Sequence, residues 1–267
     1  MAMNHTRRWQ NERRFFDDKE YDTSALPPSV VARYTECRKP WLSPEFQFYV
    51  LGDVHGKRIL EVGCGDGGNS ILLALKGACV VGVDISSRAI DAAKQRAALH
   101  GISERVTFFA TPFEQFVPPN GEKFDVVCVW SALHHLIPVL DSVLSRIVDL
   151  AKPDCLVMFA EPITSWRWLR TLRLMLPIPT NGTPDERPLE AEELAVLFKH
   201  LPKLQVQYHN GLLRVVNRFF LGGRYEDMSP FWRGVYDLVG RTDHFLLTSL
   251  GLSGIASTVT LYGTVKK

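Results

Sequence analysis

The sequence lacks a marked excess of charge of either sign. Its 267 residues include 31 Lys and Arg against 29 Asp and Glu, for a net charge of +2. An excess this small does not indicate a nucleic-acid partner on its own. The one basic cluster, at Arg7, Arg8, Arg13 and Arg14, is interpreted as a solvated helix face.

Cysteine is scarce, and its spacing fits no structural metal site. The five cysteines are odd in number, which argues against a disulfide framework. Cys79, Cys128 and Cys155 fall in apolar, strand-like runs and are expected to be small core residues. This usage favours a reducing compartment, so we predict a cytoplasmic protein.

Neither a secretory leader nor a membrane-spanning segment is predicted. The first residues are polar and charged, unlike a signal peptide. Residues 245–265 carry no charge and are long enough to cross a bilayer. Ten of them are Ser, Thr or Gly, which is too polar for a span. We expect a short helix, a glycine turn and a strand there instead.

What the sequence does contain is a glycine-rich turn between a strand and a helix. Residues 59–62 form a short apolar run, glycines follow at positions 63, 65 and 67, and residues 70–76 have the composition of a helix. Glycine permits a sharp turn and lets a ligand lie against bare main chain. Gly63, Gly65 and Gly68 also satisfy a dinucleotide fingerprint, which is a weak signal alone.

Two carboxylates near this turn favour a cationic nucleoside ligand. Glu61 lies inside the strand, where a buried carboxylate is costly unless paired. Asp66 lies in the turn, where it would repel a pyrophosphate. S-adenosylmethionine carries a sulfonium and an ammonium and no phosphate, so it suits both acids. Asp84, which ends the next strand, is expected to accept hydrogen bonds from ribose hydroxyls.

These motifs resemble those of the class I S-adenosylmethionine-dependent methyltransferase family. Glu61-Val-Gly63-Cys-Gly65-Asp-Gly67 and Val83-Asp84-Ile85-Ser86 carry the resemblance, which extends over residues 45–165. It implies S-adenosylmethionine as cofactor and S-adenosylhomocysteine as product. The cofactor contacts it implies in this part of the chain are Glu61, Gly63, Cys64, Gly65, Asp66, Gly67, Asp84 and Ile85.

Strand-like and helix-like segments alternate over residues 45–160. Strands are expected near 57–62, 79–83, 105–109, 124–129 and 155–160, and helices near 69–76, 87–100 and 138–151. This alternation predicts a Rossmann-like, doubly wound α/β sheet with its ligand at the carboxyl ends of the strands. Further strands at 204–208 and 258–263 would complete seven, mostly parallel with an antiparallel last strand.

Four regions are predicted along the chain. They are a helical lid (1–44), a core (45–209) with a cap helix near 165–176, a helical insertion (210–256) and a last core strand (257–267). The first region is either a lid over the cofactor or helices packed on the sheet edge, with Pro27 and Pro28 separating two helices. Tyr34 and Phe16 are its candidates for contact with cofactor or substrate.

The loops after the third and fourth strands supply further cofactor candidates. Pro112 stands where the family commonly has an acid that binds adenine. Since Pro112 has neither an acidic side chain nor an N–H group, Phe113 is expected to supply a backbone N–H to the adenine and to pack its ring on it. Glu114 is the nearest acid. Trp130 and Ser131, after the fourth strand, are expected to line the methionine end of the cofactor.

Two histidines and one acid are the candidate catalytic residues. A histidine in a loop is a natural general base near neutral pH. We expect His134 to face the methyl acceptor. His135 is expected to serve as an orienting residue or as a second contact. Glu161 is expected to face the acceptor pocket from the end of the fifth strand. Two histidines without an acid suit Mg²⁺ poorly, so no metal is predicted.

The predicted function is S-adenosylmethionine-dependent methylation of a small molecule, with a lipid-like or natural-product acceptor left open. The nucleic-acid signatures of the family that this sequence resembles, such as Pro-Pro-Tyr after the fourth strand, are absent, so a nucleic-acid acceptor is not expected. Trp166–Leu176 is compatible with peripheral membrane contact, an anionic substrate or a simple cap, and 210–256 with an acceptor pocket, a lipid-facing surface or an oligomer interface. The alternatives are an NAD-dependent oxidoreductase, against which Glu61 and Asp66 argue, and a catalytically silent cofactor-binding protein.

Overall fold

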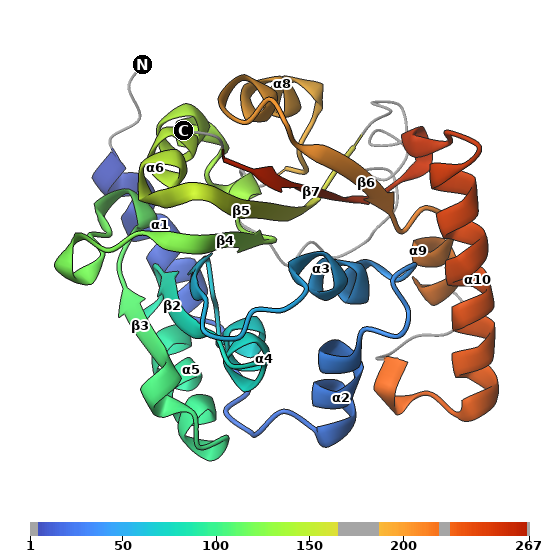
Figure 1. Ribbon diagram of the computed structural model, residues 1–267, viewed down its shortest axis with the longest axis horizontal. Helices are drawn as coiled ribbons and strands as arrows, with labels where there is room; N and C mark the ends of the chain where they lie inside the picture. Colours follow the sequence, from blue (N-terminus) through green and yellow to red (C-terminus); the bar gives the residue numbers. More distant parts are fainter. Residues whose placement is uncertain (1–4, 165–186, 219–224, 266–267) are drawn as a thin grey trace.

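A computed structural model describes residues 5–164, 187–218 and 225–265 (Figure 1). These residues form a seven-stranded sheet with the order β3-β2-β1-β4-β5-β7-β6. Strands β3 to β5 pair in parallel along that order, and β7 is antiparallel to both of its neighbours. The predicted Rossmann-like sheet, mostly parallel with an antiparallel last strand, is confirmed.

The strands lie close to their predicted positions. They are β1 Arg58–Val62, β2 Cys79–Asp84, β3 Val106–Ala110, β4 Phe124–Trp130, β5 Ala151–Pro162, β6 Gln205–His209 and β7 Thr258–Thr264. The largest difference is in β5, which begins earlier than predicted because Ala151 pairs with Phe124 before an irregularity in the β4–β5 ladder.

Helices cover both faces of the sheet (Figure 1). One face packs against α3 Ser43–Leu51, α4 Gly68–Leu75 and α5 Ser87–Leu99, and the other against α6 Leu140–Leu150 and α8 Ala191–His200. Side chains of β1 alternate between the two cores, with Ile59 on the first side and Leu60 on the second. The glycine turn lies at the carboxyl end of this doubly covered strand.

The first residues of α5 and α8 are fixed by side chains that bind the free N–H groups of the first turn. Ser86 caps α5, its Oγ accepting from the Ala89 N–H at 3.1 Å. Helix α8 begins at Ala191, three residues after Pro188. Glu190 and Glu193 form a reciprocal capping box there, which satisfies the first-turn N–H groups.

Two of the three cysteines expected in the core are buried. Cys128 and Cys155 lie inside the sheet, at 0% and 1% exposed. The prediction for Cys79 is wrong, because it opens β2 and is exposed to solvent.

The N-terminal region and the insertion both contain helices. The first contains α1 His5–Asp17 and α2 Pro28–Glu36, and α3 runs across the boundary expected at residue 44. The second contains α9 Leu212–Val216 and α10 Pro230–Thr248, the latter standing at the right edge of Figure 1. Trp166–Leu176 lies outside the described residues.

The charge-free segment of residues 245–265 has the predicted helix–turn–strand form. It contains the end of α10, a 3-10 turn at Ser253–Ile255 and β7. Among the helices described here, none is both long and apolar enough to cross a bilayer.

Candidate functional site

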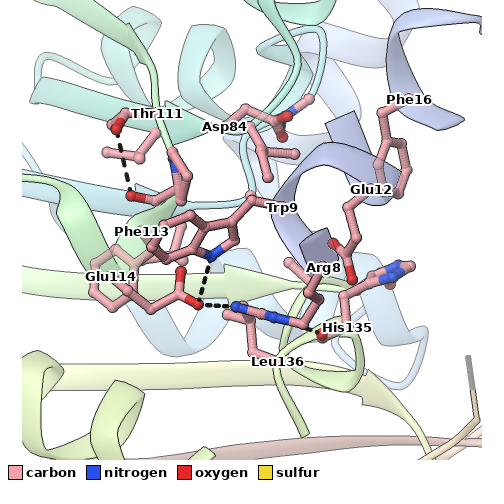
Figure 2. Close-up of a pocket in the computed structure, with 18 of the residues that line it drawn as sticks. Arg8, Trp9, Glu12, Phe16, Asp84, Thr111, Phe113, Glu114, His135 and Leu136 are labelled. Carbon is pink, nitrogen blue, oxygen red and sulfur yellow. Dashed lines mark hydrogen bonds and ion pairs between the residues drawn. The ribbon is translucent and has the colours of Figure 1, made fainter. Parts of the chain in front are cut away.

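Two neighbouring cavities lie at the carboxyl ends of the strands, and Ser131 lines both. The first, of about 270 Å³, is enclosed by the loops after β1, β2, β3 and β4 and by α1 (Figure 2). The second, of about 410 Å³, lies among α2, α3, the start of α4 and the ends of β4 and β5. This is the position predicted for a ligand of such a sheet.

Gly63 and Gly65 line the first cavity with main chain. Gly63 has φ +72°, and a Cβ there would lie 2.3 Å from the Ala132 Cβ. Gly65 has φ +52° and donates its N–H to Asp84 Oδ2 at 2.9 Å. Gly67 lies away from the cavity, where a Cβ would come within 2.8 Å of the Ala93 Cβ, so it serves the packing of α4 on α5.

Asp84 lines the first cavity beside Ile85, as the sequence predicted for the end of β2. Its two carboxylate oxygens accept N–H groups of Gly65 and Ser86, each at 2.9 Å. Burial raises the pKa of Asp84, and the backbone donors oppose that rise. The carboxyl is therefore held in one orientation at the rim of the glycine turn.

Besides Gly67, three residues predicted to contact the cofactor line neither cavity. Glu61 is 1% exposed and accepts a hydrogen bond from the Ser70 hydroxyl. Asp66 forms an ion pair of 2.7 Å with Arg96, which draws its carboxylate toward α5. Cys64 is buried behind the turn. Glu61 and Asp66 are each bonded to a protein side chain that the local sequence pattern does not reveal.

The loop after β3 forms the opposite wall of the first cavity. Pro112, Phe113 and Glu114 all line it. Glu114 accepts the Trp9 indole N–H at 3.1 Å and forms an ion pair with Arg8 (Figure 2). The acid nearest the expected adenine position is thus bound to α1.

Helix α1 covers the first cavity, and side-chain bonds hold it in place at both ends. Besides the contacts of Glu114, Arg13 donates to the Ile85 carbonyl at 3.2 Å, and the Ser86 hydroxyl donates to Asp17 at 2.7 Å. Trp9, Glu12 and Phe16 line the cavity from this helix. Of these only Phe16 was predicted, although a spacing of three and four residues marks one helix face.

The second cavity collects most of the remaining predicted residues. Tyr34, Trp130 and Glu161 line it together with Ser131. The Trp130 ring stacks on Phe48 with an interplanar angle of 18°. Sequence reasoning missed Gln47, which accepts the Trp130 indole N–H at 2.9 Å, and Asn69 at the start of α4.

The turn after β4 is organised around Glu161. Its Oε1 accepts the N–H groups of Ala132 and Leu133 at 3.0 and 2.9 Å. Its Oε2 lies 2.7 Å from His134 Nδ1. These contacts satisfy a carboxylate that is 1% exposed.

The two histidines have different surroundings, and only His134 departs from its expected orientation. His134, expected to face the acceptor, is 6% exposed and lines neither cavity. His135 lines the first cavity, where its ring meets Phe16 at a centroid distance of 5.3 Å. Within the described parts of the chain, no three His, Cys, Asp or Glu side chains are grouped so as to hold a metal ion.

The chain is similar in sequence to known methyltransferases. Residues 59–154 match the family model of a methyltransferase domain. The ubiquinone biosynthesis O-methyltransferase of Bordetella parapertussis is 31% identical over 147 residues, which are 49% of this chain and 59% of that protein. The protein of the same name from Neisseria meningitidis serogroup C is 25% identical over 63% of this chain and 76% of its own. This chain thus spans about three fifths of the Bordetella relative.

Solved structures share the fold at low sequence identity. Magnesium protoporphyrin IX methyltransferase from Synechocystis PCC 6803 superposes with a TM-score of 0.56 at 15% identity, over 97% of this chain and 100% of that chain. A putative sarcosine dimethylglycine methyltransferase from Galdieria sulphuraria gives 0.57 at 13% identity, over 97% and 98%. The match of residues 59–154, which include the glycine turn and the acid that ends β2, shows that this part of the chain is similar to a methyltransferase domain.

Proposed function

We propose that the protein is an S-adenosylmethionine-dependent methyltransferase that acts on a small molecule. The observation that carries the proposal is the first cavity, where main chain at Gly63 and Gly65 faces the fixed carboxyl of Asp84. Bare main chain accommodates a nucleoside closely, and the carboxyl accepts its ribose hydroxyls.

The adenosine of the cofactor is assigned to the first cavity. Ile85 and Phe113 border the space for the base, and Asp84 the space for the ribose. Ser131 lines both cavities. In the second cavity, Asn69 and the N–H groups at the start of α4 are available as donors to the carboxylate at the methionine end of the cofactor. When bound, the cofactor supplies an electrophilic methyl group on its sulfonium.

The second cavity is assigned to the methyl acceptor. Its wall of Tyr34, Phe48 and Trp130 suits an apolar or aromatic body. The relatives named above are O-methyltransferases of ubiquinone biosynthesis, which supports a hydroxylated, lipid-like acceptor. Tyr34 therefore contacts the acceptor or the methionine end of the cofactor, and not the adenosine.

The residues of the turn after β4 divide into two roles. Glu161 and His134 are buried and bonded to each other, so they position the turn. His135 lines the first cavity and not the second, so it is the candidate to take a proton from an acceptor whose hydroxyl extends past Ser131 into the first cavity. The remaining work of the protein is to align the acceptor and exclude water.

Calorimetry with S-adenosylhomocysteine and with NAD tests the proposal. We expect micromolar or tighter binding of the first and none of the second; the opposite result would indicate an oxidoreductase. Binding without transfer of labelled methyl to any extractable small molecule would instead identify a silent cofactor-binding protein.

A cytoplasmic location is part of the proposal. It is supported by the five cysteines, none of which forms a disulfide in the structure. Membrane contact through Trp166–Leu176 and self-association through 210–256 are kept as proposals, the first tested by deleting that segment and the second by light scattering.

A further inference from the structure

Helix α2 forms one wall of the second cavity and has little packing of its own. Val30 and Tyr34, one helical turn apart, line that cavity, together with Leu26 just before the helix. None of the nine described residues of α2 is fully buried. A helix of this length is too short to be stable alone. Its position therefore depends on its contacts with the rest of the protein.

Arg33, next to Tyr34 in α2, joins the helix to two separate parts of the chain. Its Nε donates to Glu45 Oε1 at 2.6 Å, and its Nη1 donates to Glu226 Oε1, also at 2.6 Å. Glu45 lies on α3 and is 1% exposed, whereas Glu226 lies in a 3-10 turn of the insertion, Tyr225–Asp227. Figure 1 shows α2 beside the segment that leads into α10. One guanidinium thus links α2 both to the core and to the insertion.

A second ionic contact holds the chain just after α2. Lys39 Nζ lies 2.6 Å from Asp237 Oδ2 on α10, and it also donates to the Tyr225 hydroxyl. The main-chain N–H of Lys39 donates to Glu45 Oε2 at 2.8 Å. Glu45 therefore binds Arg33 with one oxygen and the backbone of Lys39 with the other, and the insertion binds both of their side chains.

Tyr225 lies at the centre of these contacts. The Arg33 guanidinium is 4.2 Å and the Lys39 ammonium 4.6 Å from the centroid of its ring, which are distances of cation–π contact. Arg233 donates to the carbonyls of Tyr225 and Glu226 at 3.2 and 2.5 Å, which fixes the turn that carries them. We name the following residues the α2 ion-pair cluster: Arg33, Lys39, Tyr225, Glu226 and Asp237.

We propose that the α2 ion-pair cluster sets the position of α2 and thereby controls access of the methyl acceptor to the second cavity. Glu226 and Asp237 do not line that cavity, so they are positioning residues that act through α2. The side chains of Arg33 and Glu226 are only 12% and 15% exposed, and loss of one partner of a shielded pair is more costly than loss from a surface pair. The inference rests on the proposed assignment of the second cavity to the acceptor.

The first cavity is closed by different contacts. Helix α1 is held by Glu114 and by the bond between Ser86 and Asp17, and none of these residues belongs to the α2 ion-pair cluster. Weakening the cluster should therefore open the second cavity and leave the binding of S-adenosylhomocysteine unchanged.

Thiol labelling inside the second cavity tests this inference without a known acceptor. Ala160, 5% exposed, lines the cavity at the end of β5. The reporter is Ala160→Cys in a full chain that also carries Cys37→Ser and Cys79→Ser, at the two cysteines that are not buried. Adding Glu226→Ala and Asp237→Ala should raise the rate of labelling by bulky fluorescein-5-maleimide about tenfold or more. The small reagent methyl methanethiosulfonate should gain less, because it needs less movement of α2.

Glu36→Ala is the matched control. Glu36 pairs with Arg38 at 2.8 Å beside the cluster, but the two side chains are 47% and 78% exposed and do not join α2 to the insertion. Its loss should leave the labelling rate unchanged. Amide hydrogen exchange in residues 28–36 should become faster in the double alanine variant and not in the control. If circular dichroism shows that the double alanine variant misfolds, Glu226→Gln with Asp237→Asn takes its place.

Three results would overturn the proposal. The first is an unchanged rate of maleimide labelling in the double variant, and the second is an equal rise in Glu36→Ala. The third is faster labelling accompanied by weaker binding of S-adenosylhomocysteine in calorimetry, because both cavities would then have loosened together. Absence of S-adenosylhomocysteine binding by the unaltered chain would count against the proposed activity and would not change the labelling result, so the two failures are distinguishable.

Discussion

His134 Nδ1 lies 2.7 Å from Glu161 Oε2, and both side chains are buried. The same carboxylate holds the N–H groups of Ala132 and Leu133. One acid at the end of β5 thereby fixes the turn that follows β4. Since Ser131 of that turn lines both cavities, the pair connects the sheet to the site.

Replacing Glu161 should damage both stability and activity. Glu161→Ala leaves buried N–H groups without an acceptor, each costing about 1–3 kcal/mol. We expect a loss of about 3 kcal/mol or more in the free energy of unfolding, measured in urea, whereas Glu192→Gln, at an exposed position of α8, should change it little. A stability equal to wild type in Glu161→Ala would refute the role of Glu161 in holding the turn.

The histidines allow positioning to be separated from proton transfer. We expect His134→Gln to lower stability and to reduce turnover at all pH values alike, because its ring is buried against Glu161. His135→Gln should leave stability nearly unchanged and lower kcat by about 10²-fold or more on a hydroxyl acceptor. Pre-ionised acceptor at high pH should recover much of the His135→Gln loss. Full turnover by His135→Gln at neutral pH would remove that residue from the chemistry.

Asp84 and Asp66 provide a matched pair for cofactor binding. Asp84→Ala removes a carboxylate that lines the first cavity and accepts the Gly65 N–H. We expect its dissociation constant for S-adenosylhomocysteine to rise by about 10–100-fold, in line with hydrogen bonds to a charged group. Asp66→Asn should raise it by less than about threefold, since Asp66 pairs with Arg96. Calorimetry measures both, and equal effects would mean that Asp66 reaches the cofactor.

Asp84, Asp66 and Glu61 show which parts of the site could be predicted from the sequence. Gly63, Gly65 and Asp84 were predicted because a strand, a turn and a helix of fixed geometry bring them together over a short stretch of chain. Asp66 and Glu61 were assigned to the ligand because their partners were unknown. Arg96 reaches Asp66 only after α5 packs beside the turn, which is a tertiary event.

The position of α1 was beyond sequence reasoning for the same reason. Arg8 and Trp9 bond to Glu114, more than a hundred residues away in the chain. The spacing of Trp9, Glu12 and Phe16 indicates a helix face, and it does not say which surface that face meets. The strands were predicted well because their apolar runs respond to burial on both faces of a sheet.

The bond between Glu114 and α1 should control access to the first cavity. Glu114→Ala removes the acceptor of the Trp9 indole and the partner of Arg8. We expect faster amide hydrogen exchange in residues 5–17 and a rise of about 3–10-fold in the dissociation rate of S-adenosylhomocysteine. Glu104→Ala, at an exposed position before β3, is the control. Unchanged exchange in α1 would show that its remaining contacts suffice to hold it.

Glu61 should make stability fall as the pH rises. Burial raises the pKa of Glu61 from 4.5 to about 8, although the Ser70 hydroxyl bond opposes the rise. Between these values the unfolded chain is ionised at this residue while the folded chain keeps the proton, so folding takes up a proton and stability is lost with increasing pH.

The isosteric change Glu61→Gln isolates this effect. Wild type should lose about 2 kcal/mol between pH 6.5 and 8, since one proton is worth about 1.4 kcal/mol per pH unit. Glu61→Gln should be flatter over that window and more stable at pH 8. Burial lowers the pKa of His209 from 6.5 to about 3. The titration of His209 therefore affects the free energy of unfolding mainly below pH 6.5, outside the range used to test Glu61. If the urea midpoints of wild type and Glu61→Gln change equally with pH from 6.5 to 8, Glu61 is ionised in the folded chain. It would then again be a candidate to bind a cationic cofactor.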